Sequence, residues 1–148
     1  MESKLPQNIV IATDGSENTR RAISHGIGIA KLSGATVYAL YVIDTPSTIS
    51  ESWTACKGTI YTIMRMDGEK AVSNVKRLGE ASGVEVKKVV LDGCPSNEII
   101  EFAENNNIDL IVMGTLGKTG LERFLMGSVA ERVVRNSKVP VMVVRSEK

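Results

Sequence analysis

The sequence has few of the residues from which most catalytic and metal sites are built. It holds two cysteines, one histidine and 4% aromatic residues in 148 positions. Cys56 and Cys94 stand far apart without a CxxC pair, which argues against zinc and disulfide frameworks and predicts free thiols. His25 falls inside a helical pattern, so we expect a surface or structural role for it. No G-x-S-x-G elbow, HExxH motif or Cys-His pair occurs.

Charge of one sign and long apolar runs are lacking too. The chain has 18 basic and 17 acidic residues, and no basic stripe with interleaved aromatics, which excludes nucleic acid as the main partner. No run reaches membrane-spanning length, and Met1–Pro6 has no apolar core of signal-peptide length, so no membrane contact is expected. We expect a single cytoplasmic domain over residues 1–148.

What the sequence does contain is an alternation of short apolar runs with segments of helical periodicity. The runs predict strands at Asn8–Thr13, Ala35–Ile43, Val84–Leu91, Ile108–Met113 and Val139–Val144. The periodic segments predict helices at Glu17–Ser33, Asp67–Ser82, Pro95–Asn106 and Ser128–Asn136. This order predicts an α/β fold, a doubly wound five-stranded parallel sheet with helices on both faces.

Local signals mark the ends of the first helix. Ser16 is expected to cap its N-terminus with the side chain, and Gly34 to end it in a left-handed conformation. The segment Asp44–Arg65 is long, polar and without a clear pattern, which predicts a loop that acts as a lid or a contact surface. Trp53 within it is expected to anchor the loop or to stack on a base or a partner.

The most informative motif is Gly114–Gly117, followed after nine residues by Gly127–Ser128. It comes after an apolar run and opens onto a helical pattern. Glycine lets backbone approach a ligand closely, and the first turn of a helix offers unpaired N–H groups to a phosphate. A Walker A loop is excluded because Val112 replaces its first glycine, and a GxGxxG motif is excluded because Leu116 fills its middle position. The motif predicts a nucleotide site.

Two strand orders, 2-1-3-4-5 and 3-2-1-4-5, are compatible with this pattern. The second makes strands one and four neighbours, so that Thr13–Ser16 and Gly114–Gly117 meet at the switch point where ligands bind. That coincidence favours 3-2-1-4-5. Asp14 is then expected to accept a ribose hydroxyl or to help hold Mg²⁺, with helix capping as the alternative.

Other residues near these junctions have two interpretations each. Val42 could line an adenine slot or belong to the core, and Ser128 could bind phosphate or cap the last helix. Lys118 and Arg123 could neutralise phosphate charge or face solvent. A response-receiver function is disfavoured because Asp14 has no second acid beside it.

Together these residues resemble the universal stress protein family, in its nucleotide-binding branch. The resemblance runs from Asn8–Ser16 to Val139–Val144. The family motif G-2x-G-9x-G-[S/T] is matched by Gly114, Gly117, Gly127 and Ser128. The resemblance implies the 3-2-1-4-5 sheet, ATP across strands one and four with Mg²⁺ held through the phosphates, and a homodimer paired through the last strand.

Position by position, the resemblance also implies which residues bind the nucleotide. The implied residues are Thr13, Asp14, Val42, Met113, Gly114, Gly117, Gly127, Ser128, Val129 and Ala130. Val42 would meet adenine through its backbone, and the residues from Gly127 onward would surround the phosphates. Ala130 departs from relatives that carry a hydroxyl there, which leaves the preference between ATP, ADP and AMP open.

We therefore expect an ATP-binding stress-response regulatory protein that acts as a nucleotide-dependent homodimer with an unidentified protein partner. The apolar strand Val139–Val144 supports the dimer independently, since exposed apolar sheet edges pair with another chain. The alternative is a slow Mg²⁺-dependent ATP hydrolase or phosphotransferase using Asp14. A nucleotide-free scaffold is disfavoured by the glycine motif.

Overall fold

A computed structural model of the chain describes residues 4–45, 51–115 and 126–146, with side chains from residue 58 onward in the second stretch. The strands are β1 (Asn8–Ala12), β2 (Thr36–Asp44), β3 (Val86–Gly93), β4 (Leu110–Gly114) and β5 (Val141–Val144). The helices are α1 (Arg20–Ser33), preceded by the 3₁₀ turn η1 (Glu17–Thr19), α2 (Glu51–Ala81), α3 (Pro95–Asn105) and α4 (Ser128–Asn136).

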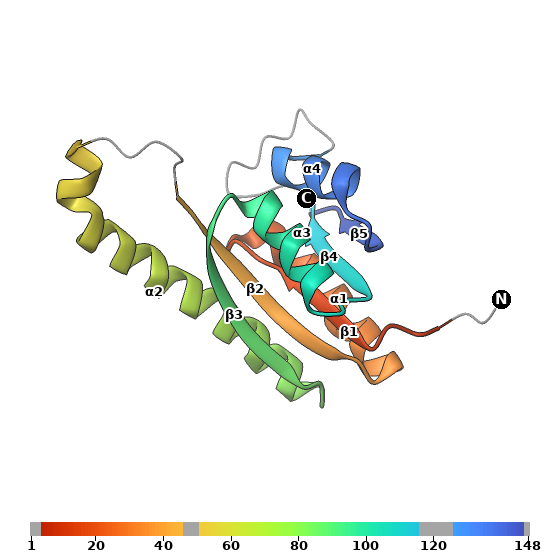
Figure 1. Cartoon of the computed structure of the whole chain (residues 1–148). Coiled ribbons are helices and arrows are strands. Elements are labelled where there is room, and N and C mark those ends of the chain that lie inside the picture. The colour runs from red at the N-terminus through yellow and green to blue at the C-terminus, as the bar shows by residue number, and fades with distance from the viewer. Residues whose placement is uncertain (1–3, 46–50, 116–125, 147–148) are drawn as a thin grey trace.

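The strands form one parallel sheet in the order β3-β2-β1-β4-β5 (Figure 1). The order 3-2-1-4-5 predicted from the polar strand ends is confirmed, and its rival 2-1-3-4-5 is wrong. β1 pairs with β2 on one side and with β4 on the other, with Ile9 opposite Val37 and Leu110. β3 lies at one edge of the sheet, as the partial alternation of apolar and polar residues in the third predicted strand indicated.

Helices cover both faces of the sheet, each over its own apolar layer. α1 and α2 pack on one face of the sheet, in an apolar layer that includes Ile11 of β1 and Val72 of α2. α3 and α4 pack on the other face, in a layer that includes Val10 of β1 and Val133 of α4. Neighbouring residues of β1 alternate between the two layers, as a strand buried on both faces must. This is the doubly wound arrangement that the sequence predicted.

Glycine lets α1 lie close against the sheet. A Cβ on Gly26 would stand 2.6 Å from Cδ1 of Ile11, a side chain that is fully buried. Gly28, two residues on, faces open space. Gly34 ends α1 with φ 74°, the left-handed conformation that was predicted for it.

The prediction of a loop over Asp44–Arg65 is wrong for most of that segment. Asp44 is the last residue of β2, and α2 begins at Glu51 and continues for 31 residues. A helix of that length spans about 46 Å, and Figure 1 shows its N-terminal part extending past the end of the sheet. Trp53 falls within this helix, where the side chains lie outside the described residues.

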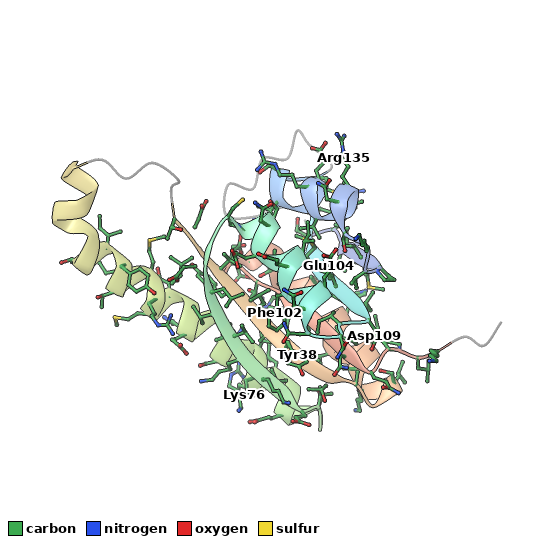
Figure 2. All side chains as sticks on the ribbon, viewed as in Figure 1. Tyr38, Lys76, Phe102, Glu104, Asp109 and Arg135 are labelled. Carbon is green, nitrogen blue, oxygen red and sulfur yellow. The ribbon has the colours of Figure 1, made fainter. Side chains whose placement is uncertain are left out.

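Polar groups lie at both ends of the sheet. At the amino end, Oδ2 of Asp109 accepts the backbone N–H groups of Gln7 and Asn8, each at 2.9 Å. Figure 2 shows Asp109 at that end, and Tyr38 and Phe102 between the sheet and α3. The two rings meet edge to face, with centroids 5.7 Å apart. The carboxyl end holds the candidate site.

Candidate nucleotide site

The turn after β1 is shaped by hydrogen bonds from its own side chains. Oδ1 of Asp14 accepts the N–H of Ser16 at 2.9 Å, and Oγ1 of Thr13 accepts the N–H of Gly15 at 3.1 Å. Gly15 has φ 81°, a left-handed conformation that glycine adopts without steric cost. The buried hydroxyl of Thr13 also lies 3.1 Å from that of Thr19. This network fixes where the Asp14 carboxylate stands.

The predicted capping role of Ser16 is wrong. Ser16 precedes η1 in an extended conformation, and its side chain makes no cap hydrogen bond. Its hydroxyl oxygen is buried and has no hydrogen-bond partner among the described residues. The N–H of Ser16, not its hydroxyl, takes part in the turn. Asp14 therefore serves the local turn through one oxygen, and it does not take the alternative role of helix cap, because Ser16 and Thr19 are the N-cap residues of η1 and α1.

On the other side of the switch point, β4 leads to the N-terminus of α4. The N–H of Thr115 donates to the carbonyl of Val144 at 3.0 Å, and the N–H of Gly127 donates to the carbonyl of Thr115. Gly127, with φ −72° and ψ 167°, is the N-cap of α4, and no side chain caps this helix. Ser128 is the first residue of the helix, so its alternative role as the N-cap is wrong.

The first turn of α4 presents three backbone donors. The earliest bond of the helix joins the N–H of Glu131 to the carbonyl of Gly127, at 3.0 Å. The N–H groups of Ser128, Val129 and Ala130 precede it and have no intrahelical acceptor. Such donors, together with the helix dipole, suit an anion. The conformation of Gly127 is open to any residue, so its backbone angles do not require glycine there.

These two junctions border one cleft of about 350 Å³ at the carboxyl end of the sheet. That volume lies in the range of small-molecule sites. The described residues that line the cleft are Ala12, Thr13, Asp14, Thr19, Leu40, Tyr41, Val42, Asp44, Met64, Pro95, Ile99, Met113, Gly114, Gly127, Ser128 and Val129. The polar lining comes from Thr13, Asp14 and Thr19 after β1, Ser128 of α4 and Asp44 at the end of β2, and apolar side chains come from residues such as Leu40, Val42, Pro95 and Ile99.

Most of the predicted site residues are brought together here. Thr13, Asp14, Val42, Met113 and Gly114 line the cleft from three neighbouring strands. Three more predicted residues line it from the start of α4, namely Gly127, Ser128 and Val129.

Two predicted residues stand apart from this group. The side chain of Ala130 is buried in the apolar layer under α3 and α4, which leaves only its backbone N–H for a ligand. Gly117 lies outside the described residues, as do Lys118 and Arg123. His25 is exposed on α1, with Nδ1 3.1 Å from the carbonyl of Arg21, which fits the surface role expected for it.

Sequence reasoning missed the wall that α2 and α3 contribute. Met64 of α2 and Pro95 and Ile99 of α3 line the cleft beside Val42. Met64 lies in the segment predicted as a loop, so no helical face pointed to it. Pro95 was placed correctly at the start of a helix, but nothing in its local pattern linked that helix to the site.

Comparison with known proteins decides the family. The model of the universal stress protein family matches residues 6–145. The chain belongs to the universal stress protein family. Universal stress protein MJ0531 of Methanocaldococcus jannaschii is 46% identical over 144 residues, which cover 97% of this chain and 85% of that protein.

Solved structures of universal stress proteins have the same fold. The structure of MJ0577, from the same organism, matches with a TM-score of 0.86 and 32% identity, covering 97% of this chain and 99% of that one. A universal stress protein in complex with cAMP matches with a TM-score of 0.75 and 25% identity over 97% and 100% of the two chains. None of the described helices is long and apolar enough to cross a membrane.

Proposed function

We propose that this universal stress protein binds an adenine nucleotide, with ATP as the expected form, in the cleft between β1, β4 and α4. The observation that carries the proposal is that Asp14 and the first turn of α4, whose N–H groups have no intrahelical acceptor, line the same cleft. A carboxylate suits a ribose hydroxyl, and a helix N-terminus suits a phosphate. The relative solved with cAMP, an adenine nucleotide, supports the choice of ligand.

The layout of the cleft gives the nucleotide a direction. The donors of α4 and the glycines lie at the β4 end, and the apolar wall with Val42 lies at the β2 end. β4 and β2 are two strand spacings apart, about 10 Å. The phosphates are therefore assigned to the β4 end, the ribose to Asp14 and the base to the β2 end. Mg²⁺ enters the proposal with the phosphates, at the β4 end.

The test is thermal unfolding with ATP, ADP and AMP, each with and without Mg²⁺. A nucleotide at 100 times its dissociation constant stabilises the native state by about 2.7 kcal/mol. At roughly 2–4 °C per kcal/mol for a chain of this size, Tm rises by about 5–11 °C. Gly127→Val places a branched side chain at the start of α4, where it excludes the phosphates and removes this gain.

The control for Gly127→Val is Gly28→Ala, which changes a glycine that faces open space and does not line the cleft. Gly34→Ala is unsuitable because the positive φ of Gly34 strains any other residue. Gly28→Ala keeps the full response to ATP. If Gly127→Val also keeps it, the phosphates bind elsewhere and the proposal is wrong. Rapid multiple turnover of labelled ATP by the pure protein would instead favour the hydrolase.

The proposal includes a homodimer paired through β5. β5 is an edge strand whose one partner among the described strands is β4. The carbonyls of Pro140 and Val144 accept N–H groups from Ile111 and Thr115. Backbone groups alternate along a strand, so those of Val141 and Val143 point outward from the sheet, where a second β5 could pair with them.

A further inference from the structure

A side-chain hydrogen bond joins the N-terminal half of α2 to the sheet. The hydroxyl of Tyr61 donates to the carboxylate of Asp92, at 2.9 Å from Oδ2 and 3.2 Å from Oδ1. Asp92 lies near the end of β3, where its register partner is Ile43 of β2. The bond therefore joins α2 to the carboxyl end of the sheet, the end that carries the cleft.

Tyr61 stands one helical turn before Met64. Residues three apart share a helix face, and both side chains are partly buried against the apolar layer under α1 and α2. Met64 also lines the cleft, at the end formed by Val42 and Asp44. A contact that fixes Tyr61 against Asp92 thus fixes the place of Met64 over that end of the cleft.

A second contact one turn further along brings α2 close to the same end. A Cβ on Gly68 would stand 2.8 Å from Cδ1 of Tyr41, so only glycine lets the helix lie this near to the ring. Tyr41 is buried and lines the cleft. From Gly68 onward the helix is held by apolar burial, with Val72 and Val75 fully buried. Before Gly68 the described side chains of α2 are at most partly buried, and there the Tyr61–Asp92 hydrogen bond holds the helix to the sheet.

The chemistry of Met64 suits the base rather than the phosphates. A thioether is polarisable and adaptable, and it makes favourable contacts with aromatic rings. Val42, Pro95 and Ile99 also line the cleft with apolar side chains, and the charged group at this end, Asp44, is a carboxylate that repels a phosphate. The α4 donors lie at the opposite end. A flat aromatic base fits between such walls, whereas a phosphate would lose its hydration there without a charged partner.

We propose that Tyr61 is a positioning residue: its hydrogen bond to Asp92 holds Met64 against the base of the bound nucleotide. This inference rests on the proposed function and adds to it the helix, α2, that contacts the base. Tyr61 itself does not line the cleft, so its effect on binding passes through Met64. Substituting Tyr61 then weakens ligands that carry a base and leaves ligands that consist of phosphate alone unchanged.

The test compares two ligands, ATP and inorganic tripolyphosphate, by calorimetric titration of the full chain. Tyr61→Phe removes one hydrogen bond to an exposed carboxylate, for which we expect the Kd of ATP to rise about threefold to tenfold. The Kd of tripolyphosphate stays as in the wild type. Met64→Ala raises the Kd of ATP by a similar factor. Combined with Tyr61→Phe it causes little further loss, because both changes remove one contact.

A matched control is available on the same helix. The hydroxyl of Ser73 accepts a hydrogen bond from Nζ of Lys88 at 3.4 Å, which also links α2 to β3, and neither residue lines the cleft. Ser73→Ala therefore leaves the affinity for ATP unchanged. Asp92→Asn keeps an acceptor for the Tyr61 hydroxyl and restores most of the affinity that Asp92→Ala loses. Unfolding in urea without ligand shows whether each variant is folded.

Three results overturn the inference. They are a folded Tyr61→Phe variant with the ATP affinity of the wild type, an equal loss for tripolyphosphate, and fully additive effects of Tyr61→Phe and Met64→Ala. A wild-type protein that binds no nucleotide overturns the proposed function itself. Wild-type binding together with an unaffected Tyr61→Phe variant removes only the positioning role.

Discussion

Asp14 offers the sharpest test of how the nucleotide lies in the cleft. One carboxylate oxygen, Oδ1, accepts the N–H of Ser16 at 2.9 Å. In the proposal the second oxygen accepts a ribose hydroxyl. A hydrogen bond to a charged group contributes about 1.5–3 kcal/mol. Asp14 is only half-buried, so we take the lower bound, which corresponds to about tenfold in Kd.

Two substitutions separate the ligand role of Asp14 from its role in the turn. Asp14→Asn keeps an oxygen for the N–H of Ser16 but loses the charge, and neutral hydrogen bonds have about half the strength of charge-assisted ones. We expect the Kd of ATP to rise about threefold for Asp14→Asn and at least tenfold for Asp14→Ala. The second figure includes the loss of the turn hydrogen bond, which disturbs the loop itself.

The assay is calorimetric titration with ATP, 2′-deoxy-ATP and 3′-deoxy-ATP, each against the wild type and both variants. If Asp14 accepts a ribose hydroxyl, the wild type discriminates against the analogue that lacks this hydroxyl by about tenfold. Asp14→Ala loses that discrimination, because the partner of the hydroxyl is gone. A variant that still discriminates as strongly as the wild type refutes the reasoning, since the hydroxyl would then have another acceptor.

Three further predictions concern stability, thiol reactivity and assembly. Gly26→Ala should lower the free energy of unfolding by about 1–2 kcal/mol, measured in urea, because a fully buried isoleucine of β1 must move. Gly28→Ala on the same helix should raise it by about 0.5–1 kcal/mol, and the reverse order would contradict the packing of α1. Hydrogen bonding to the hydroxyl of Ser96 lowers the pKa of the Cys94 thiol below its ordinary value. In a protein whose other cysteine, Cys56, is replaced, alkylation of Cys94 should therefore begin at a lower pH than that of an ordinary free thiol. Ser96→Ala should raise the pH at which this alkylation begins. Val143→Pro removes an outward N–H of β5, so light scattering at micromolar concentration should detect a monomer; an unchanged dimer would place the interface elsewhere.

The strand order could be predicted because the expected nucleotide site requires the first and fourth strands to be neighbours. Only 3-2-1-4-5 brings the polar junctions after Ala12 and Met113 to neighbouring strands, and the structure has that order. Apolar runs also located every strand, with errors of up to two residues at the ends. β3, for example, continues to Gly93 because Gly93 pairs with Asp44 of β2. That pairing is a tertiary effect that a local pattern does not contain.

The first half of α2 could not be predicted for a physical reason. Helical periodicity is visible only where one face is buried, and between Glu51 and Arg65 the described contacts with the body come from Tyr61 and Met64. Gly58 and the β-branched residues around it also lower helix propensity. The base end of the candidate site was missed with it, since Met64 reaches the cleft from this helix.

The position of β1 in the middle of the sheet affects how the chain is made. Its second neighbour, β4, lies about 100 residues later in the sequence, with Ile9 opposite Leu110. At about 5–20 residues per second, a ribosome needs roughly 5–20 s to add that length. During this interval one side of β1, whose residues Ile9, Val10 and Ile11 are fully buried in the native state, has no strand partner, and such an edge invites aggregation. Slowing translation after β2 should therefore lower the yield of folded protein.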